Sequence, residues 1–233
     1  MVIACGTLPE SFLKAYTVRE HAESLLRDGE IRLGHLNSYK EMEDAAKEDP
    51  QEGEARFRVP GLVPRVDVNI ESGDTRELQP VQGEFNYSGS WHNPFYAFCC
   101  SKLTVDRNHQ VAKLGSQVVE IFDTHVFRQS LQAACDGLEV NGHTLSRIHF
   151  IEVDYDKGGT RDAEEARKVE AYIGAKPPRF EADQEIRVVL AFNGPNSGAP
   201  GSLMLRLPKP STFCRQWTLA NKAMQTDAAS RLR

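Results

Sequence analysis

Hydrophobic residues recur at helical spacing in two stretches of the chain. Over residues 18–27 the apolar positions fall on one side of a helix, and Gly29 follows as a residue suited to a left-handed cap. Residues 124–136 carry a second apolar stripe, formed by Val126, Phe127, Leu131 and Ala134. Two charged segments, 39–47 and 160–173, also have a helical composition. The pattern therefore predicts amphipathic helices that pack with one side against a core.

Shorter apolar runs rich in strand-favouring residues fill much of the remaining chain. The predicted strands cover residues 12–16, 31–36, 91–102, 116–122, 146–155, 186–192 and 202–207. The elements do not alternate regularly as βαβ units do, so we expect an α+β fold. The expected architecture is a single domain over residues 1–217, with a twisted mixed or mostly antiparallel sheet and two to three packed helices.

Two segments depart from this pattern. Residues 61–90 are interrupted by glycines and prolines, which mark turns, so we expect a loop or hairpin excursion there. Residues 218–233 contain few large apolar residues and no periodicity. We therefore expect them to form a poorly ordered tail.

The amino-acid composition indicates a globular protein. The 233 residues are 40% hydrophobic and 26% charged, which is typical of a globular domain. A net charge of -5 argues against broad electrostatic binding of nucleic acid. No apolar stretch approaches the roughly 20 residues that span a membrane, and the N-terminus lacks the pattern of a signal peptide. The five cysteines lack the spacing of a disulfide framework or a zinc site, so a cytoplasmic location is expected.

Glu185 is the leading candidate for chemistry. It is an acid that opens the apolar run IRVVLAF, at a place where the end of a sheet meets solvent. A carboxylate there would stabilise a cationic sugar transition state or activate a hydroxyl nucleophile. The structural alternative is an internal pair with Arg187, which lies two residues later on the same face of the strand.

Four other residues are candidates for binding a ligand. Ser101 follows the aromatic strand and would orient a ligand, or it is an ordinary strand-end serine. Lys14 and Tyr16 would hold a ribose or phosphate, or they are a solvated lysine and a half-buried tyrosine. Tyr39 would stack on a planar ring, or it belongs to the core.

No metal site is expected. Six acids lie between Glu41 and Glu52, but their spacing does not match a calcium loop, and a solvated acidic face explains them better. The seven histidines are scattered, with no pair at ligand spacing on one face. Motifs of dinucleotide-binding folds, phosphate loops, zinc proteases and serine hydrolases are absent from the sequence.

Three stretches resemble small stand-alone bacterial proteins of unknown function. They are GEIRLGHLNSYKEMED with the following DPQEG, then FYAFCCS, and finally KPPRFEADQEIR. The resemblance covers roughly residues 12–192. The order of elements is also similar to that of ADP-ribosyltransferases, which use a first-strand basic or aromatic residue, a serine or threonine on a middle strand and a glutamate on a late strand.

This resemblance implies an enzyme that cleaves NAD, its substrate, and transfers ADP-ribose to a macromolecular acceptor. Glu185 would be catalytic, and Lys14 or Tyr16 and Ser101 would hold the ribose and phosphates. The chain departs from the family where FLKAY lacks an arginine or histidine, and where no second Glu or Gln stands two residues before Glu185. If the resemblance holds, Glu185 should share one cleft with Ser101 and with Lys14 or Tyr16.

Two other classes remain open. One is a non-catalytic binding module whose acidic turn engages a basic partner. The other is a metal-dependent nuclease, which predicts a carboxylate pair next to a lysine, whereas the sequence has Arg187 after Glu185.

Overall fold

The computed structural model describes residues 3–36, 54–68, 75–90, 94–103, 117–155, 173–194 and 201–217. The expected helix over 39–47, nearly all of the expected helix over 160–173 and the tail over 218–233 lie outside these residues. Among the described residues, no helix combines the length and the apolar character needed to cross a bilayer.

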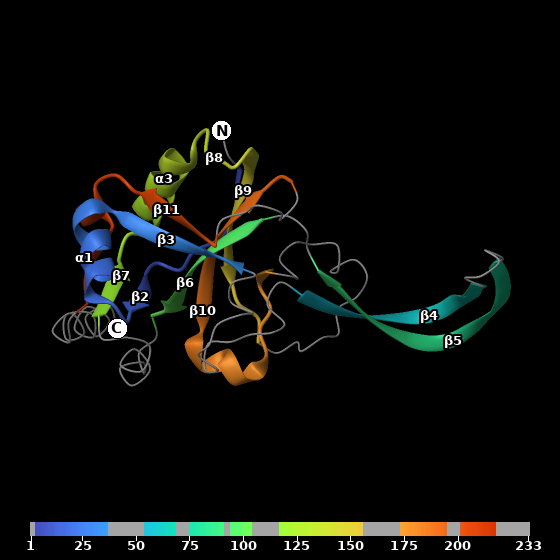
Figure 1. The fold of residues 1–233 in the computed structure, drawn as a ribbon. Helices are drawn as coiled ribbons and strands as arrows, with labels where there is room; N and C mark the ends of the chain where they lie inside the picture. Colours follow the sequence, from blue (N-terminus) through green and yellow to red (C-terminus); the bar gives the residue numbers. More distant parts are fainter. Residues whose placement is uncertain are drawn as a thin grey trace.

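A mixed sheet of ten strands forms the body of the molecule (Figure 1). Its main path runs through β1 (Ile3–Gly6), β9 (His143–Glu152), β10 (Glu185–Phe192), β6 (Phe95–Lys102), β2 (Phe12–Tyr16), β7 (Gln117–Ile121) and β12 (Cys214–Gln216). Neighbouring strands on this path are antiparallel, except that β1 runs parallel to β9. The short β8 (Glu139–Val140) pairs with β9. The expected α+β class with a mixed, mostly antiparallel sheet is confirmed.

The sheet divides at β6. The first part of β6 pairs with β3 (Glu30–His35), through Tyr96 and Ala97, whereas its end pairs with β2 through Ser101 and Lys102. β3 in turn pairs with β11 (Ser202–Arg206). One edge of β6 therefore serves two branches of strands, while its other edge pairs with β10.

Two α-helices pack against the sheet, α1 (Arg19–Asp28) and α3 (Thr124–Cys135) (Figure 1). Gly29 ends α1 with a φ of 71° and donates its N–H to the carbonyl of Leu25 at 3.0 Å. A side chain at Gly29 would meet the backbone oxygen of Leu207 at 2.0 Å, so this position requires glycine. Asp123 caps α3 by accepting the N–H of Val126 at 2.9 Å. The structure also has the 3₁₀ segments η3 (Pro178–Asp183) and η4 (Pro210–Thr212).

The two faces of the sheet bury different sets of side chains. The larger cluster joins apolar residues of the strands to Leu25 of α1 and to Phe127 and Leu131 of α3. A smaller cluster on the other face includes Val189 of β10 and Ile173. Every residue of β10 is buried, which agrees with the prediction of a core strand from its apolar run.

A long two-stranded ribbon extends from the body (Figure 1). It consists of β4 (Glu54–Val68) and β5 (Thr75–Ser90), which pair with each other in an antiparallel register. The segment 61–90, expected as a loop or hairpin excursion, supplies most of this hairpin.

Candidate functional site

A single row of residues crosses four neighbouring strands of the sheet. Glu185 at the start of β10 lies opposite Ser101 of β6, and Ser101 lies opposite Leu13 of β2. Leu13 in turn lies opposite Glu120 of β7. Residues directly opposite each other on paired strands share one face of the sheet. The row therefore places a serine and two glutamates on one face, with Leu13 between Ser101 and Glu120.

Glu185 is buried, with 5% of its surface exposed. Nε of Arg187 donates to its Oε1 at 2.7 Å, and Nζ of Lys176 lies 2.8 Å from its Oε2. Arg187, itself 1% exposed, also donates from Nη1 to the carbonyl of Ile173 at 2.9 Å. Both carboxylate oxygens thus have a cationic partner. The internal Glu185–Arg187 pair considered from the sequence is present, and it is buried rather than at an exposed edge.

The charge state of this cluster follows from its contacts. Burial alone would raise the pKa of Glu185, but Arg187 and Lys176 outweigh burial and lower the pKa to about 2. Burial alone would lower the pKa of Lys176, but the Glu185 carboxylate reverses the shift and raises it. All three groups are therefore charged at neutral pH, and the cluster carries one net positive charge.

The backbone fixes where β10 begins. Gln184, which precedes Glu185, has a φ of 43° and accepts the N–H of Lys102 at 3.0 Å. The N–H of Glu185 donates to the hydroxyl oxygen of Tyr155 at 2.6 Å, and its carbonyl accepts the N–H of Val153 at 3.0 Å. These bonds fix the backbone of Glu185 against β6 and β9, and the ion pairs with Arg187 and Lys176 hold its carboxylate.

Lys14 and Tyr16 do not join Glu185 and Ser101 in one cleft, contrary to the expectation. Leu13 shares the face of Ser101, and successive residues of a strand face opposite sides, so Lys14 and Tyr16 lie on the other face. Nζ of Lys14 donates to the carbonyl of Cys99 at 2.7 Å and lies 4.8 Å from the ring centre of Phe98. Both residues are thus packed towards the larger core.

Tyr16 is set in an apolar environment. Its hydroxyl oxygen is buried and has no hydrogen-bond partner among the described residues. Burial raises the pKa of this hydroxyl well above its ordinary value, so it stays neutral. Tyr39 and the acids between Glu41 and Glu52 lie outside the described residues.

The structure adds residues that the sequence did not single out. Glu120 has no exposed side-chain surface and accepts a hydrogen bond from Nε of Arg215 at 2.7 Å. An acid inside the apolar run QVVEI was the available signal for Glu120. Lys176 and Tyr155 gave no comparable signal, because each reaches Glu185 from a separate segment of the chain.

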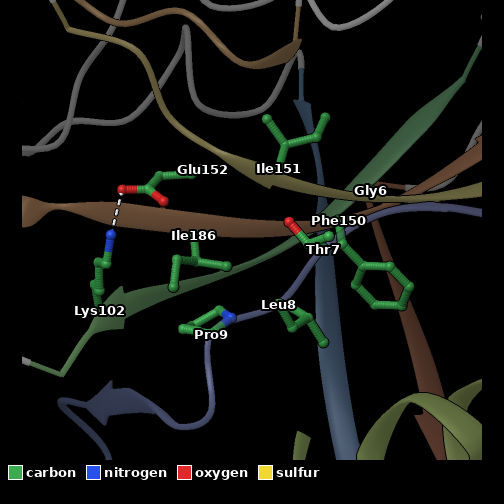
Figure 2. A pocket seen from close by; sticks show the side chains of 9 residues that line it. All are labelled: Gly6, Thr7, Leu8, Pro9, Lys102, Phe150, Ile151, Glu152 and Ile186. Carbon is green, nitrogen blue, oxygen red and sulfur yellow. Dashed lines mark hydrogen bonds and ion pairs between the residues drawn. The ribbon is translucent and has the colours of Figure 1, made fainter. Parts of the chain in front are cut away.

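Two hollows lie near the start of β10. The larger, of about 420 Å³, is lined by Ile186, Phe150 and the segment 6–9, with Lys102 and Glu152 joined at 2.7 Å on one side (Figure 2). Phe150 and Ile186 belong to the larger core cluster, so this hollow lies on the face opposite Glu185.

The smaller hollow, of about 210 Å³, is lined by Tyr155 and Gln184, which both adjoin Glu185. Its other polar residues are the acids Glu152, Asp154 and Glu181. Through Tyr155 and Gln184, this acidic hollow adjoins the backbone of Glu185.

The five cysteines are free, and burial keeps four of them in the neutral thiol form. Burial raises the pKa of Cys99, Cys135 and Cys214 to about 12, and raises that of Cys100 further. A thiol attacks as its thiolate, so these four are unsuited to nucleophilic catalysis at neutral pH.

Within the described ranges, no three His, Cys, Asp or Glu side chains are grouped so as to hold a metal ion. The searches against family models, curated proteins and solved structures found no match to this chain.

Proposed function

We propose that this protein is an ADP-ribosyltransferase-like enzyme that cleaves NAD and transfers ADP-ribose to a macromolecular acceptor. One observation supports the proposal: Glu185 and Ser101 lie on adjacent strands, β10 and β6, and on one face of the sheet, whereas Lys14 and Tyr16 of β2 lie on the other face. Glu185 and Ser101 are 84 positions apart in the sequence, yet they lie directly opposite each other on the paired strands β10 and β6.

The chemical role of Glu185 follows from its charge. Breaking the bond between nicotinamide and ribose leaves a positive charge on the sugar, and the bonding electrons depart with nicotinamide. An ionised carboxylate lowers the energy of that cation, and for this role Glu185 must turn at least one oxygen from Arg187 or Lys176 towards the sugar. A hydroxyl of the acceptor then attacks the sugar carbon, and its proton passes to a base. Ser101, on the same face, would donate a hydrogen bond to the ribose.

The test is NAD consumption by the wild-type protein and by three variants. Ser101→Ala and Glu185→Gln should each lose turnover, with Glu185→Gln lower by about 10²–10³-fold because a preorganised charge is gone. Glu185→Gln also removes the carboxylate charge that faces Arg187 and Lys176, and breaking a buried ion pair costs about 3–5 kcal/mol of stability. Thermal unfolding must therefore be measured beside activity.

Glu120→Gln is the matched control. Glu120 is also a buried glutamate paired with an arginine, but it lies three strands from Glu185, or about 14 Å at the usual strand spacing. It should retain NAD turnover. Equal turnover in wild type and Glu185→Gln would remove Glu185 from the mechanism, and loss in all three variants would point to damaged folding.

A binding module without catalysis is the second candidate. It is favoured by the contacts of Glu185, because a carboxylate with both oxygens ion-paired and 5% exposure has a sufficient structural role. Absence of NAD turnover in the wild-type protein, across nucleic-acid and protein acceptors, would select this candidate.

A further inference from the structure

Arg187 and Lys176 hold the carboxylate of Glu185 in different ways. The Arg187 side chain is 1% exposed, belongs to β10 itself, and also donates from Nη1 to the carbonyl of Ile173 at 2.9 Å. Moving its guanidinium away from Oε1 would therefore break a second buried hydrogen bond. The Lys176 side chain is 11% exposed and reaches Oε2 from the segment before η3. A lysine carries its ammonium on a flexible four-carbon stem, so this cation can move by side-chain rotation.

Oε2 is thus the oxygen of Glu185 that can be released to a ligand. Release of Oε1 would leave the buried Arg187 charge without its carboxylate, which is strongly unfavourable. Release of Oε2 moves the Lys176 ammonium from a partly buried ion pair towards water, which hydrates an ammonium strongly. The backbone N–H of Lys176 donates to the carbonyl of Asp154 at 3.2 Å, and this bond does not depend on the side chain.

The surroundings of the Lys176 ammonium suit a cation of another kind as well. Nζ lies 2.8 Å from Oε2 of Glu185 and 4.9 Å from the ring centre of Phe180. Phe180 is buried in a small apolar cluster with Val153 and Tyr155. A carboxylate beside an aromatic ring is an arrangement that binds organic cations. The chain therefore fills a cation-binding place with its own lysine.

We propose that Lys176 competes with a cationic ligand for Oε2 of Glu185, and that the ligand binds by displacing the Lys176 ammonium. The ligand class is a compact organic cation. The identity of that cation rests on the proposed function: NAD carries a positive charge on its nicotinamide ring, and cleavage moves the positive charge to the sugar. Lys176 then acts as a built-in inhibitor that holds the carboxylate until the substrate arrives.

Charge favours displacement of Lys176 over binding beside it. With Lys176 in place, the cluster of Glu185, Arg187 and Lys176 carries one net positive charge and repels a cation. With the ammonium moved away, Glu185 and Arg187 together are neutral. A cation at Oε2 then restores the pairing that Lys176 had provided. Ligand and ammonium therefore exclude each other at this oxygen.

The test is calorimetric titration of the full chain with nicotinamide methylated at its ring nitrogen, which is a cation, and with uncharged nicotinamide. Lys176→Ala should bind the methylated cation about tenfold or more tightly than the wild type, and should gain no affinity for nicotinamide. Adding Glu185→Gln to Lys176→Ala should abolish the gain, because the charge that attracts the cation is removed.

Lys102→Ala is the matched control. Lys102 is also an ion-paired lysine, 2.7 Å from Glu152, but it follows Ser101 on β6 and so lies on the face opposite Glu185. Its removal changes the net charge of the protein by the same amount as Lys176→Ala. Lys102→Ala should bind the methylated cation as the wild type does, and an equal gain in both variants would overturn the proposal.

Acetylation of the wild-type lysines decides the matter if Lys176→Ala lacks a cooperative thermal transition. Trace acetic anhydride followed by mass spectrometry should modify Lys176 severalfold faster when the methylated cation is present at high concentration, because the displaced ammonium becomes accessible. The rate at Lys102 should stay the same. Unchanged or slower acetylation of Lys176 would overturn the proposal.

The outcomes separate this inference from the proposed function. Cation-selective tightening in Lys176→Ala without NAD turnover would support displacement of Lys176 and count against the enzyme. NAD turnover in the wild type without such tightening would overturn the displacement of Lys176 alone. Tightening towards nicotinamide as strong as towards the methylated cation would also overturn it, because a cavity left by the lysine would then explain the gain.

Discussion

At the scale of single residues, Glu185 shows how burial and pairing compete. Desolvation disfavours its charge, but two cations within 2.8 Å restore it, so the group is ionised inside the protein. The sequence placed Glu185 at the start of a strand and beside Arg187. The sequence did not identify Lys176 as a partner of Glu185. The path of η3, which lies between these two residues, determines whether their side chains meet.

The carboxylate of Glu185 should make the free energy of unfolding depend on pH in the acidic range. Its pKa is about 2 in the folded protein against an ordinary 4.5, so the unfolded chain binds the proton more readily between these values. Its stabilisation is therefore present above about pH 4.5 and is lost as the pH falls towards 2. Urea unfolding at a series of pH values should show this slope, and Glu185→Gln should flatten it. An equally steep slope in the variant would contradict the assignment.

At the scale of elements, the long periodic or apolar segments were predictable. The bounds of β2 match the prediction, and α1, α3 and β10 shift by one residue at most at either end. The strands β1, β8 and β12 were not predicted, since two to four residues are too few to establish a period. Which strands pair with which could not be predicted from the sequence either. The face of the sheet on which Lys14 and Ser101 lie depends on that pairing.

The buried strand β10 gives a sharp test of the core. Val189 is fully buried between β6 and β9, so Val189→Asp places an unpaired charge in the interior. The cost of several kcal/mol is comparable with the whole stability of a domain, and the protein should unfold. Met204→Asp is the control, because Met204 on β11 is 49% exposed and should tolerate the change. A cooperative thermal transition in Val189→Asp would contradict the assignment of β10 to the core.

At the scale of the whole molecule, the buried thiols report on global opening. Cys100, Cys135 and Cys214 are each buried in the larger core cluster, which joins both helices to the sheet.

Iodoacetamide labelling followed by mass spectrometry should therefore modify these three thiols only when the domain unfolds, and at one common rate. Cys5, half-buried near the N-terminus, should be labelled separately from them. Fast labelling of Cys214 in the folded protein would show that β12 opens independently of the sheet.

The order of the strands along the chain affects how the protein folds during its synthesis. β6 ends at residue 102, but its partner β10 begins only at residue 185. Likewise, β1 cannot pair until its partner β9, residues 143–152, has been synthesised. A ribosome therefore releases most of the chain before the strand that joins β9 to β6 exists. During that interval the run FYAFCC has no partner along the β10 edge. Such distant pairing slows folding, and it leaves apolar strands exposed to aggregation or to chaperones until synthesis passes Phe192.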